Sequence, residues 1–200
     1  MEIPRHLKDQ LRVAKVIPFV GAGVSKAVKT ADGGSLFPTW KALLEAAADR
    51  LDQEKKDVHA NIVRSLLQLN TPDYLEAARR ARDGLGPLWF VLLKDELDHA
   101  REAAHAGLEL AQSIWGLKSR LVITTNYDKV LQWACPQRDD VAIWDIEAPA
   151  EQSGAIRGDL KQPTVWHLHG HIGNAASIIL TPDGYSRLYP GSEWRRSGPL

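Results

Sequence analysis

Short apolar runs alternate with longer amphipathic stretches along this chain, a pattern that predicts an α/β fold. Residues 16–20, 120–124 and 164–171 are rich in β-branched or alternating apolar residues, so we expect each run to contain a strand. Residues 120–124 are apolar on both faces, which is typical of a central parallel strand covered on both sides. Shorter strands are predicted at 141–146 and 177–180. The expected architecture is therefore a Rossmann-like, mostly parallel sheet.

Apolar residues recur at helical spacing between the first two predicted strands. Thr39 is expected to cap a helix whose apolar stripe runs from Trp40 to Leu51. We expect the next helix to bury a second stripe, formed by Val58, Ile62, Leu66 and Leu69. Residues 39–100 are therefore interpreted as a helical lobe inserted into the α/β domain. A further helix is expected from Leu108 to Gly116.

Glycine or polar residues follow three of the predicted strands, namely Gly21–Ser25, Thr125–Asp128 and His169–Gly170. Ligands bind at the carboxyl ends of the strands in an open parallel sheet. Two closely spaced glycines let a phosphate approach backbone N–H groups and favour unusual φ values, and a helix that begins near Val24 would direct its positive end at the same anion. The pattern is incomplete as a dinucleotide fingerprint, because Lys26 stands where a third glycine is expected.

The amino-acid composition excludes several kinds of function and site. Hydrophobic residues make up 44% of the 200 residues and charged residues 25%, which is ordinary for a globular protein. Lys and Arg together number 25, as do Asp and Glu, so the formal net charge is zero. A chain without net positive charge is not generally attracted to nucleic acid or to anionic membranes. The single cysteine, Cys135, excludes an intramolecular disulfide and a four-cysteine zinc module. Without a signal-like or membrane-spanning apolar run, the protein is expected to be cytoplasmic.

The three strand-end segments, in this order, resemble the GAGxS, TxNxD and HG motifs of the Sir2 (sirtuin) family. The helical lobe and the sequences TTNYD and HLHG are more similar to bacterial SIR2-like domains, many of which consume NAD+ in anti-phage defence. The resemblance implies a sirtuin-like domain over residues 1–200, without a zinc ribbon. The family's downstream Gly-Thr-Ser segment is not found before Leu200, so we expect the chain to be part of a longer protein.

The resemblance also implies roles for the matching residues. Those implied to bind NAD+ are Gly21, Ala22, Gly23, Ser25, Thr125 and Asp128, and those implied to be catalytic are Asn126 and His169. His169 would act on a ribose hydroxyl or on water. No metal is implied, and the implied partners are NAD+ itself, further copies of the chain, or a sensor domain or subunit.

NAD+ glycohydrolysis agrees with the chemistry of these residues. Nicotinamide leaves as a neutral molecule while the sugar carbon becomes oxocarbenium-like, so a carboxylate, a positioning amide and a base suffice. Asp128, Asn126 and His169 supply these three groups. The resemblance implies that this hydrolysis serves an NAD+-depleting effector. A non-catalytic NAD+ or ADP-ribose sensor and an NAD-dependent protein deacylase remain as alternatives.

Two structural alternatives remain for the same residues. Asn126 and Asp128 could instead form an Asx turn that caps the helix expected at Lys129. His167, His169 and His171 stand at alternate positions, so they could share one face of a strand and bind a metal. In the absence of such a site, His167 and His171 are interpreted as structural or pocket-wall histidines.

Overall fold

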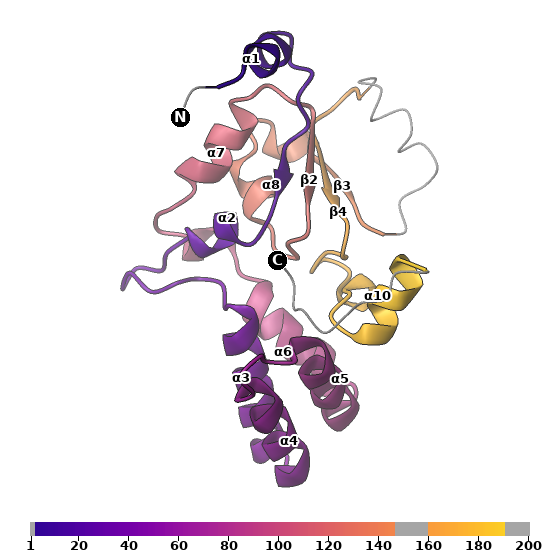
Figure 1. Ribbon diagram of the computed structural model, residues 1–200. Coiled ribbons are helices and arrows are strands. Elements are labelled where there is room, and N and C mark those ends of the chain that lie inside the picture. Colours follow the sequence, from indigo (N-terminus) through magenta and orange to yellow (C-terminus); the bar gives the residue numbers. More distant parts are fainter. Residues whose placement is uncertain (1–2, 147–159, 191–200) are drawn as a thin grey trace. The chain divides into compact units, whose positions relative to one another are not determined.

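The computed structural model describes residues 3–146 and 160–190 (Figure 1). The chain divides into two compact units. The sheet unit comprises Met1–Phe37 and Asp98–Ser177, and the helical unit comprises Pro38–Leu97 and Ile178–Leu200. The helical unit therefore includes residues from the end of the chain as well as the lobe that the sequence placed at 39–100.

The sheet unit contains a four-stranded, all-parallel sheet with the order β1-β2-β4-β3. Its strands are β1 (Phe19–Val20), β2 (Leu121–Thr124), β3 (Ala142–Trp144) and β4 (Thr164–His167). The predicted α/β class with a parallel, Rossmann-like sheet is confirmed. Strand β1 is shorter than the apolar run that predicted it.

Short helices accompany this sheet. They are α1 (Arg5–Arg12), α2 (Gly23–Lys26), α7 (Glu109–Trp115) and α8 (Val130–Ala134), with 3-10 turns η1 (Arg101–Ala103), η2 (Arg138–Asp140) and η3 (Ala175–Ser177). Helices α7 and α8 lie beside each other (Figure 1), and the indole Nε1 of Trp115 donates to the Leu131 carbonyl at 2.8 Å. In the sheet itself, Val122 and Val165 are fully buried. Helix α1 has no buried residue, and its charged sequence had not predicted it.

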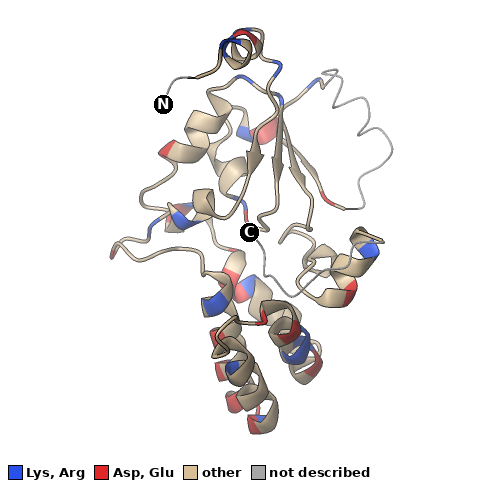
Figure 2. Ribbon diagram, in the orientation of Figure 1, with Lys and Arg blue, Asp and Glu red and all other residues tan. Residues whose placement is uncertain are grey.

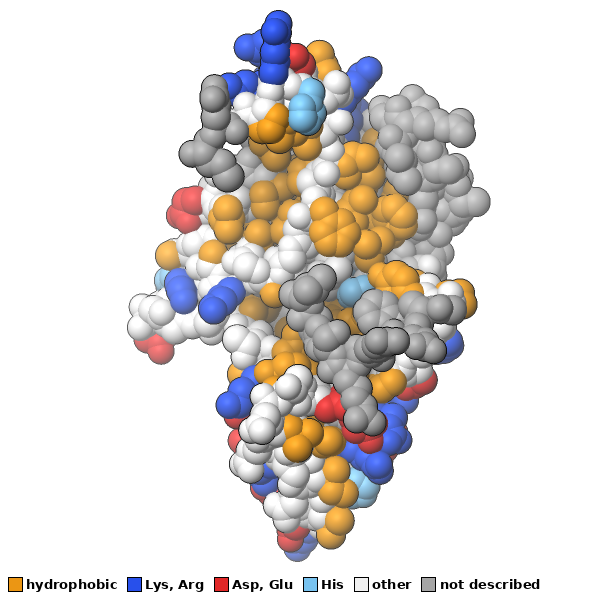
Figure 3. Space-filling view, in the orientation of Figure 1, with side chains coloured by type: hydrophobic (Ala, Val, Ile, Leu, Met, Phe, Trp, Pro, Cys, Tyr) orange, Lys and Arg blue, Asp and Glu red, His pale blue; other side chains and the backbone are white. Residues whose placement is uncertain are grey.

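The other face of the sheet carries an in-register apolar row. Phe19 pairs with Ile123, Ile123 with Trp166, and Trp166 with Trp144. Figure 3 shows hydrophobic side chains gathered over these strands. Phe19 is 64% exposed and Ile123 is only half-buried. The expectation that strand β2 is fully covered on both sides is therefore met by Val122 but not by Ile123.

Strand register brings the predicted polar segments to one edge. Val20 is paired with Thr124, and Thr124 with His167, so β1, β2 and β4 end at the same level. The ladder continues one step further, because the Leu168 N–H donates to Thr124 O at 2.9 Å and the Thr125 N–H to Val20 O at 3.3 Å. The residues that follow these three strands consequently emerge side by side.

The helical unit is built from α3 (Trp40–Gln53), α4 (Asp57–Leu67), α5 (Tyr74–Leu85), α6 (Leu88–Leu97) and α10 (Pro182–Leu188). Figure 2 shows many Lys, Arg, Asp and Glu positions along these helices. The predicted cap is confirmed, since Thr39 Oγ1 accepts from the Ala42 N–H at 3.2 Å. The strand predicted at 177–180 is wrong. Residues 178–180 are not in a strand, but Ile179 and Leu180 are buried, so the apolar pattern there reflects burial.

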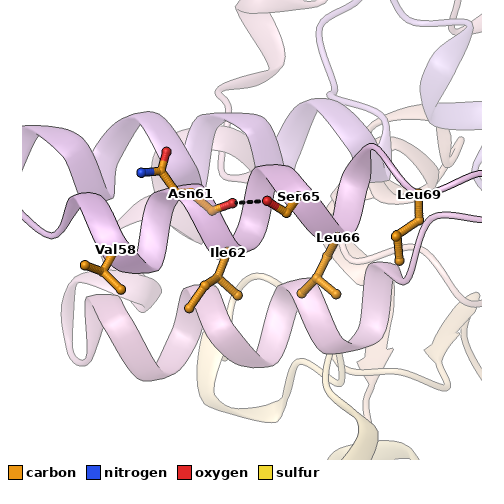
Figure 4. Close-up of a pocket in the computed structure, with 6 residues that line it drawn as sticks. All are labelled: Val58, Asn61, Ile62, Ser65, Leu66 and Leu69. Carbon is orange, nitrogen blue, oxygen red and sulfur yellow. Dashed lines mark hydrogen bonds between the residues drawn. The ribbon is translucent and has the colours of Figure 1, made fainter.

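The predicted buried face of α4 is also wrong. This helix buries Ala60, Val63 and Leu67, whereas Val58 is 73% exposed and Leu69 is 52% exposed. The expected stripe, with Asn61 and Ser65, instead lines an open groove of about 460 Å³ (Figure 4). The physical reason lies on the opposite side of the helix, where the small Ala60 lets α4 approach α3 and α5 closely and Val63 and Leu67 are buried. On the α3 side, Arg64 also contacts Asp49 at 2.7 Å and Asp52 at 2.6 Å.

Among the described residues, no helix has both the length and the apolar character needed to cross a bilayer.

Candidate active site

The turn after β1 holds the first candidate segment. Gly21 and Gly23 both have ordinary φ values, so the expectation that this turn needs the left-handed region is wrong. A Cβ added at either glycine would meet no atom of the described chain within 4 Å. Neither backbone strain nor packing against the chain therefore requires glycine here. The open space above this turn fits a group that must approach the backbone closely, as a phosphate does.

Asn126 joins the end of β2 to this turn. Its side-chain Nδ2 donates to the Gly21 carbonyl at 3.1 Å and to Ser25 Oγ at 2.7 Å. A carbonyl can only accept, so the NH₂ end of the amide must face Gly21. Both amide hydrogens are thereby used within the chain. Asn126 Oδ1 accepts nothing from the described residues, and it is the atom left to face a ligand.

Ser25 links Asn126 to Asp128. Its hydroxyl accepts from Asn126 and donates to Asp128 Oδ2 at 2.5 Å, while Asp128 Oδ1 accepts from the Val130 N–H at 3.0 Å. Burial raises the pKa of the Asp128 carboxyl, and the hydrogen bonds from Ser25 and Val130 oppose that rise. The capping role considered for Asp128 is therefore present, alongside its bond to Ser25. Asp128 is only 6% exposed and supports the Asn126 amide from inside the unit.

The main chain of Asn126 is fixed as firmly as its side chain. Its N–H donates to Thr124 Oγ1 at 3.0 Å, and the Thr124 hydroxyl in turn donates to the Val20 carbonyl at 2.9 Å. On the opposite side of the peptide, His167 Nδ1 lies 2.7 Å from the Asn126 carbonyl oxygen. Asn126 is thus tied to β1, β2 and β4 at once, and a residue held this way is preorganised for a ligand.

His169 lies two residues beyond the end of β4, at the same sheet edge. Its side chain is half-buried, and burial lowers the pKa of the imidazole. His169 is consequently neutral at pH 7 and able to accept a proton. Gly170, which follows it, has φ +90°, so glycine is required at this position to turn the chain after His169.

The other two histidines of this segment, His167 and His171, pack against each other. The His167 and His171 rings have centroids 4.5 Å apart, and the Gln132 amide reaches both. In the part of the chain that the structure describes, no three His, Cys, Asp or Glu side chains gather in a metal-binding arrangement. The structural interpretation of His167 and His171 therefore has contacts to support it. Sequence reasoning missed Gln132 and the contact of His167 with Asn126, because no motif marks either.

Acid should destabilise the fold through this buried histidine pair. Burial lowers the pKa of His167 to about 3 and that of His171 to about 4, whereas an unfolded histidine titrates near 6.5. Between pH 6.5 and 5 the unfolded chain binds protons that the folded chain does not, so stability falls as pH falls. We expect a loss of about 3 kcal/mol over this range. Urea unfolding at the two pH values measures it.

Two variants test whether the buried histidine pair causes this loss of stability. His171→Asn should remove about half of the loss, because asparagine does not titrate. Replacing the exposed His105 by alanine should leave the loss unchanged. A wild-type stability that stays constant from pH 6.5 to 5 would contradict the assignment of neutral, buried rings.

Comparison with known families gives a match to part of the chain. Residues 120–198 match the family model described as a SIR2-like domain. The matched stretch contains Asn126, Asp128, His167 and His169, and it begins after the Gly21–Ser25 turn. The turn is connected to the matched stretch by the hydrogen bonds of Asn126 to Gly21 and Ser25.

Proposed function

Residues 120–198 of this chain match the SIR2-like domain family, and from this premise we propose that the protein hydrolyses NAD+ to nicotinamide and ADP-ribose. The family is associated with NAD+ in general. The observation that supports cleavage at this site is the pair of hydrogen bonds from the Asn126 amide to Gly21 and Ser25. They tie a fixed polar side chain to a turn whose two glycines have no described atom within 4 Å of an added Cβ, and this supports the approach of a phosphate.

The proposed reaction breaks the bond between the ribose carbon and the nicotinamide nitrogen. The electron pair of that bond goes to nicotinamide, which leaves neutral and needs no acid. The sugar carbon gains positive charge, and water then bonds to it. Asn126 Oδ1, the free acceptor of its amide, would face the ribose or the attacking water. Neutral His169 would take the proton that the water releases.

Asp128 acts differently in this proposal from what the family resemblance implies. Its carboxylate is buried behind Ser25 and is engaged by Ser25 and Val130. We propose that it holds the Ser25 hydroxyl, and through it the Asn126 amide, in place. Its negative charge also contributes to the potential near the cationic sugar.

The test is an NAD+ consumption assay on the full-length protein with its natural neighbouring subunits. We expect nicotinamide release by the wild type and at least a 100-fold slower release by His169→Ala, which removes the base. An ordinary histidine becomes protonated below about pH 6.5, but burial lowers the pKa of His169. Wild-type activity should therefore persist just below pH 6.5. Equal rates in wild type and variant would refute this role.

Two further arms separate the alternatives. Calorimetric binding of NAD+ without any nicotinamide release would favour a sensor. Consumption of an acetylated peptide together with NAD+ would favour a deacylase. We propose that the protein works in the cytoplasm as the NAD+-depleting effector of an anti-phage system, joined to further copies or to a sensor. This role is supported only by the sequence resemblance to bacterial SIR2-like domains.

A further inference from the structure

A buried polar cluster beside Asn126 has no part in the reaction as proposed so far. It consists of the Gln132 amide on α8, the His167 ring at the end of β4 and the His171 ring. His167 is 1% exposed and His171 is 8% exposed. Burying the two polar rings is costly unless they are hydrogen-bonded. The position of the hydrogen on His167 follows from its contacts.

The hydrogen of His167 is assigned by the Asn126 main chain. The Asn126 carbonyl can only accept, and it lies 2.7 Å from His167 Nδ1. Nδ1 must therefore carry the hydrogen. The ring is neutral at pH 7, which leaves Nε2 as a bare acceptor.

His171 lies beside the same amide. The Gly173 N–H lies 3.0 Å from His171 Nδ1, and the Gln132 amide nitrogen lies 2.7 Å from His171 Nε2. A neutral imidazole has one acceptor nitrogen, so His171 accepts from only one of these two donors. His167 Nε2, in contrast, must find a donor.

Gln132 meets His167 with the donor end of its amide. The amide nitrogen Nε2 lies 3.4 Å from His167 Nε2 and 2.7 Å from His171 Nε2. An NH₂ group only donates, so it faces the lone pair of His167 Nε2 and favours the ring form with hydrogen on Nδ1. The position of Gln132 is thus coupled to the state of the His167 ring.

We propose that Gln132 is a positioning residue of the active site: it sets the orientation of the His167 ring, whose Nδ1–H holds the Asn126 main chain so that Asn126 Oδ1 faces the ligand. This inference rests on the proposed function, because the positioned group is the candidate catalytic Asn126. Gln132 itself does not touch the substrate.

Two replacements of Gln132 test the inference in the full-length protein. Gln132→Met keeps the length of the side chain and removes its hydrogen bonding. Gln132→Glu keeps the shape and offers only acceptors, so it should favour protonation of His167. The matched control is Gln112→Met, at an exposed glutamine of α7.

We expect Gln132→Met to lower kcat about 10-fold with KM within 2-fold, since the chemistry and not the binding of NAD+ depends on Asn126 alignment. Gln132→Glu should raise the pKa of His167 above its value of about 3 and shift the acid limb of the kcat profile. Gln112→Met should match the wild type. Wild-type kcat in Gln132→Met, or an unshifted profile in Gln132→Glu, would overturn the proposal.

Imidazole ¹⁵N shifts give a readout that needs no activity. In the wild type they should show hydrogen on Nδ1 of His167. In Gln132→Met the His167 ring should sample both tautomers, and the Asn126 amide signals should shift. If the wild type does not hydrolyse NAD+ but these shifts appear, the proposed function fails and the positioning network stands. Unchanged shifts in a folded Gln132→Met would refute the network itself.

Discussion

Replacing Asn126 with alanine should slow nicotinamide release from NAD+ at least 100-fold while the protein stays folded. The side chain is held by Gly21, Ser25 and its own fixed main chain, so its oxygen is in position before any ligand binds. Removal of a single preorganised polar group of this kind costs enzymes about 10²–10³ in kcat. The cost in stability should be smaller, about 1–2 kcal/mol, because two hydrogen bonds are lost.

The control for this prediction is Asn61→Ala. Asn61 is an exposed asparagine on α4, and it should change neither NAD+ cleavage nor stability appreciably. Single-turnover kinetics and urea unfolding on the same preparations separate the two effects. Activity retained in Asn126→Ala, with the fold intact, would exclude Asn126 from the chemistry. Activity and stability lost together would reduce it to a structural residue.

Gly107→Ala should be the most destabilising single-methyl change in the sheet unit. Gly107 has φ +87°, and an added Cβ would lie 1.9 Å from the Ala27 carbonyl oxygen and 2.5 Å from its carbon. These are backbone atoms of the segment that follows α2, and they cannot move aside as a side chain could. That segment is held by hydrogen bonds of Lys29 to His105 and Ala106. We expect a loss of at least about 3 kcal/mol in the free energy of unfolding.

Gly33→Ala separates crowding from backbone strain. Gly33 has φ +83°, but a Cβ there would meet no described atom within 4 Å. Its replacement should therefore cost only the strain of the left-handed conformation, about 1–2 kcal/mol. Denaturant midpoints of the two variants measure the difference. Equal costs at the two positions would show that the contact with Ala27 is relieved elsewhere.

Much of the fold could be predicted because local patterns report it directly. The β-branched run of β2 and the Thr39 cap both follow from short-range preferences, and both are found. The face of α4 could not be predicted in this way. Two stripes on that helix are apolar, and the choice between them depends on which side of α4 packs against α3 and α5. Periodicity alone does not contain that information.

The candidate site also has features that the sequence predicts and features that only the tertiary structure decides. The sequence by itself determined which residue types follow each strand, and their likeness to SIR2-like motifs, because a motif is a local arrangement of residues. Only the tertiary structure decided that Asn126 presents its oxygen and not its NH₂, since Gly21 and Ser25 are about 100 positions away along the chain. It likewise decided that Gln132, His167 and His171 share one cluster. Parallel strand register creates these neighbours, because it brings the ends of β1, β2 and β4 to one level whatever their separation in sequence.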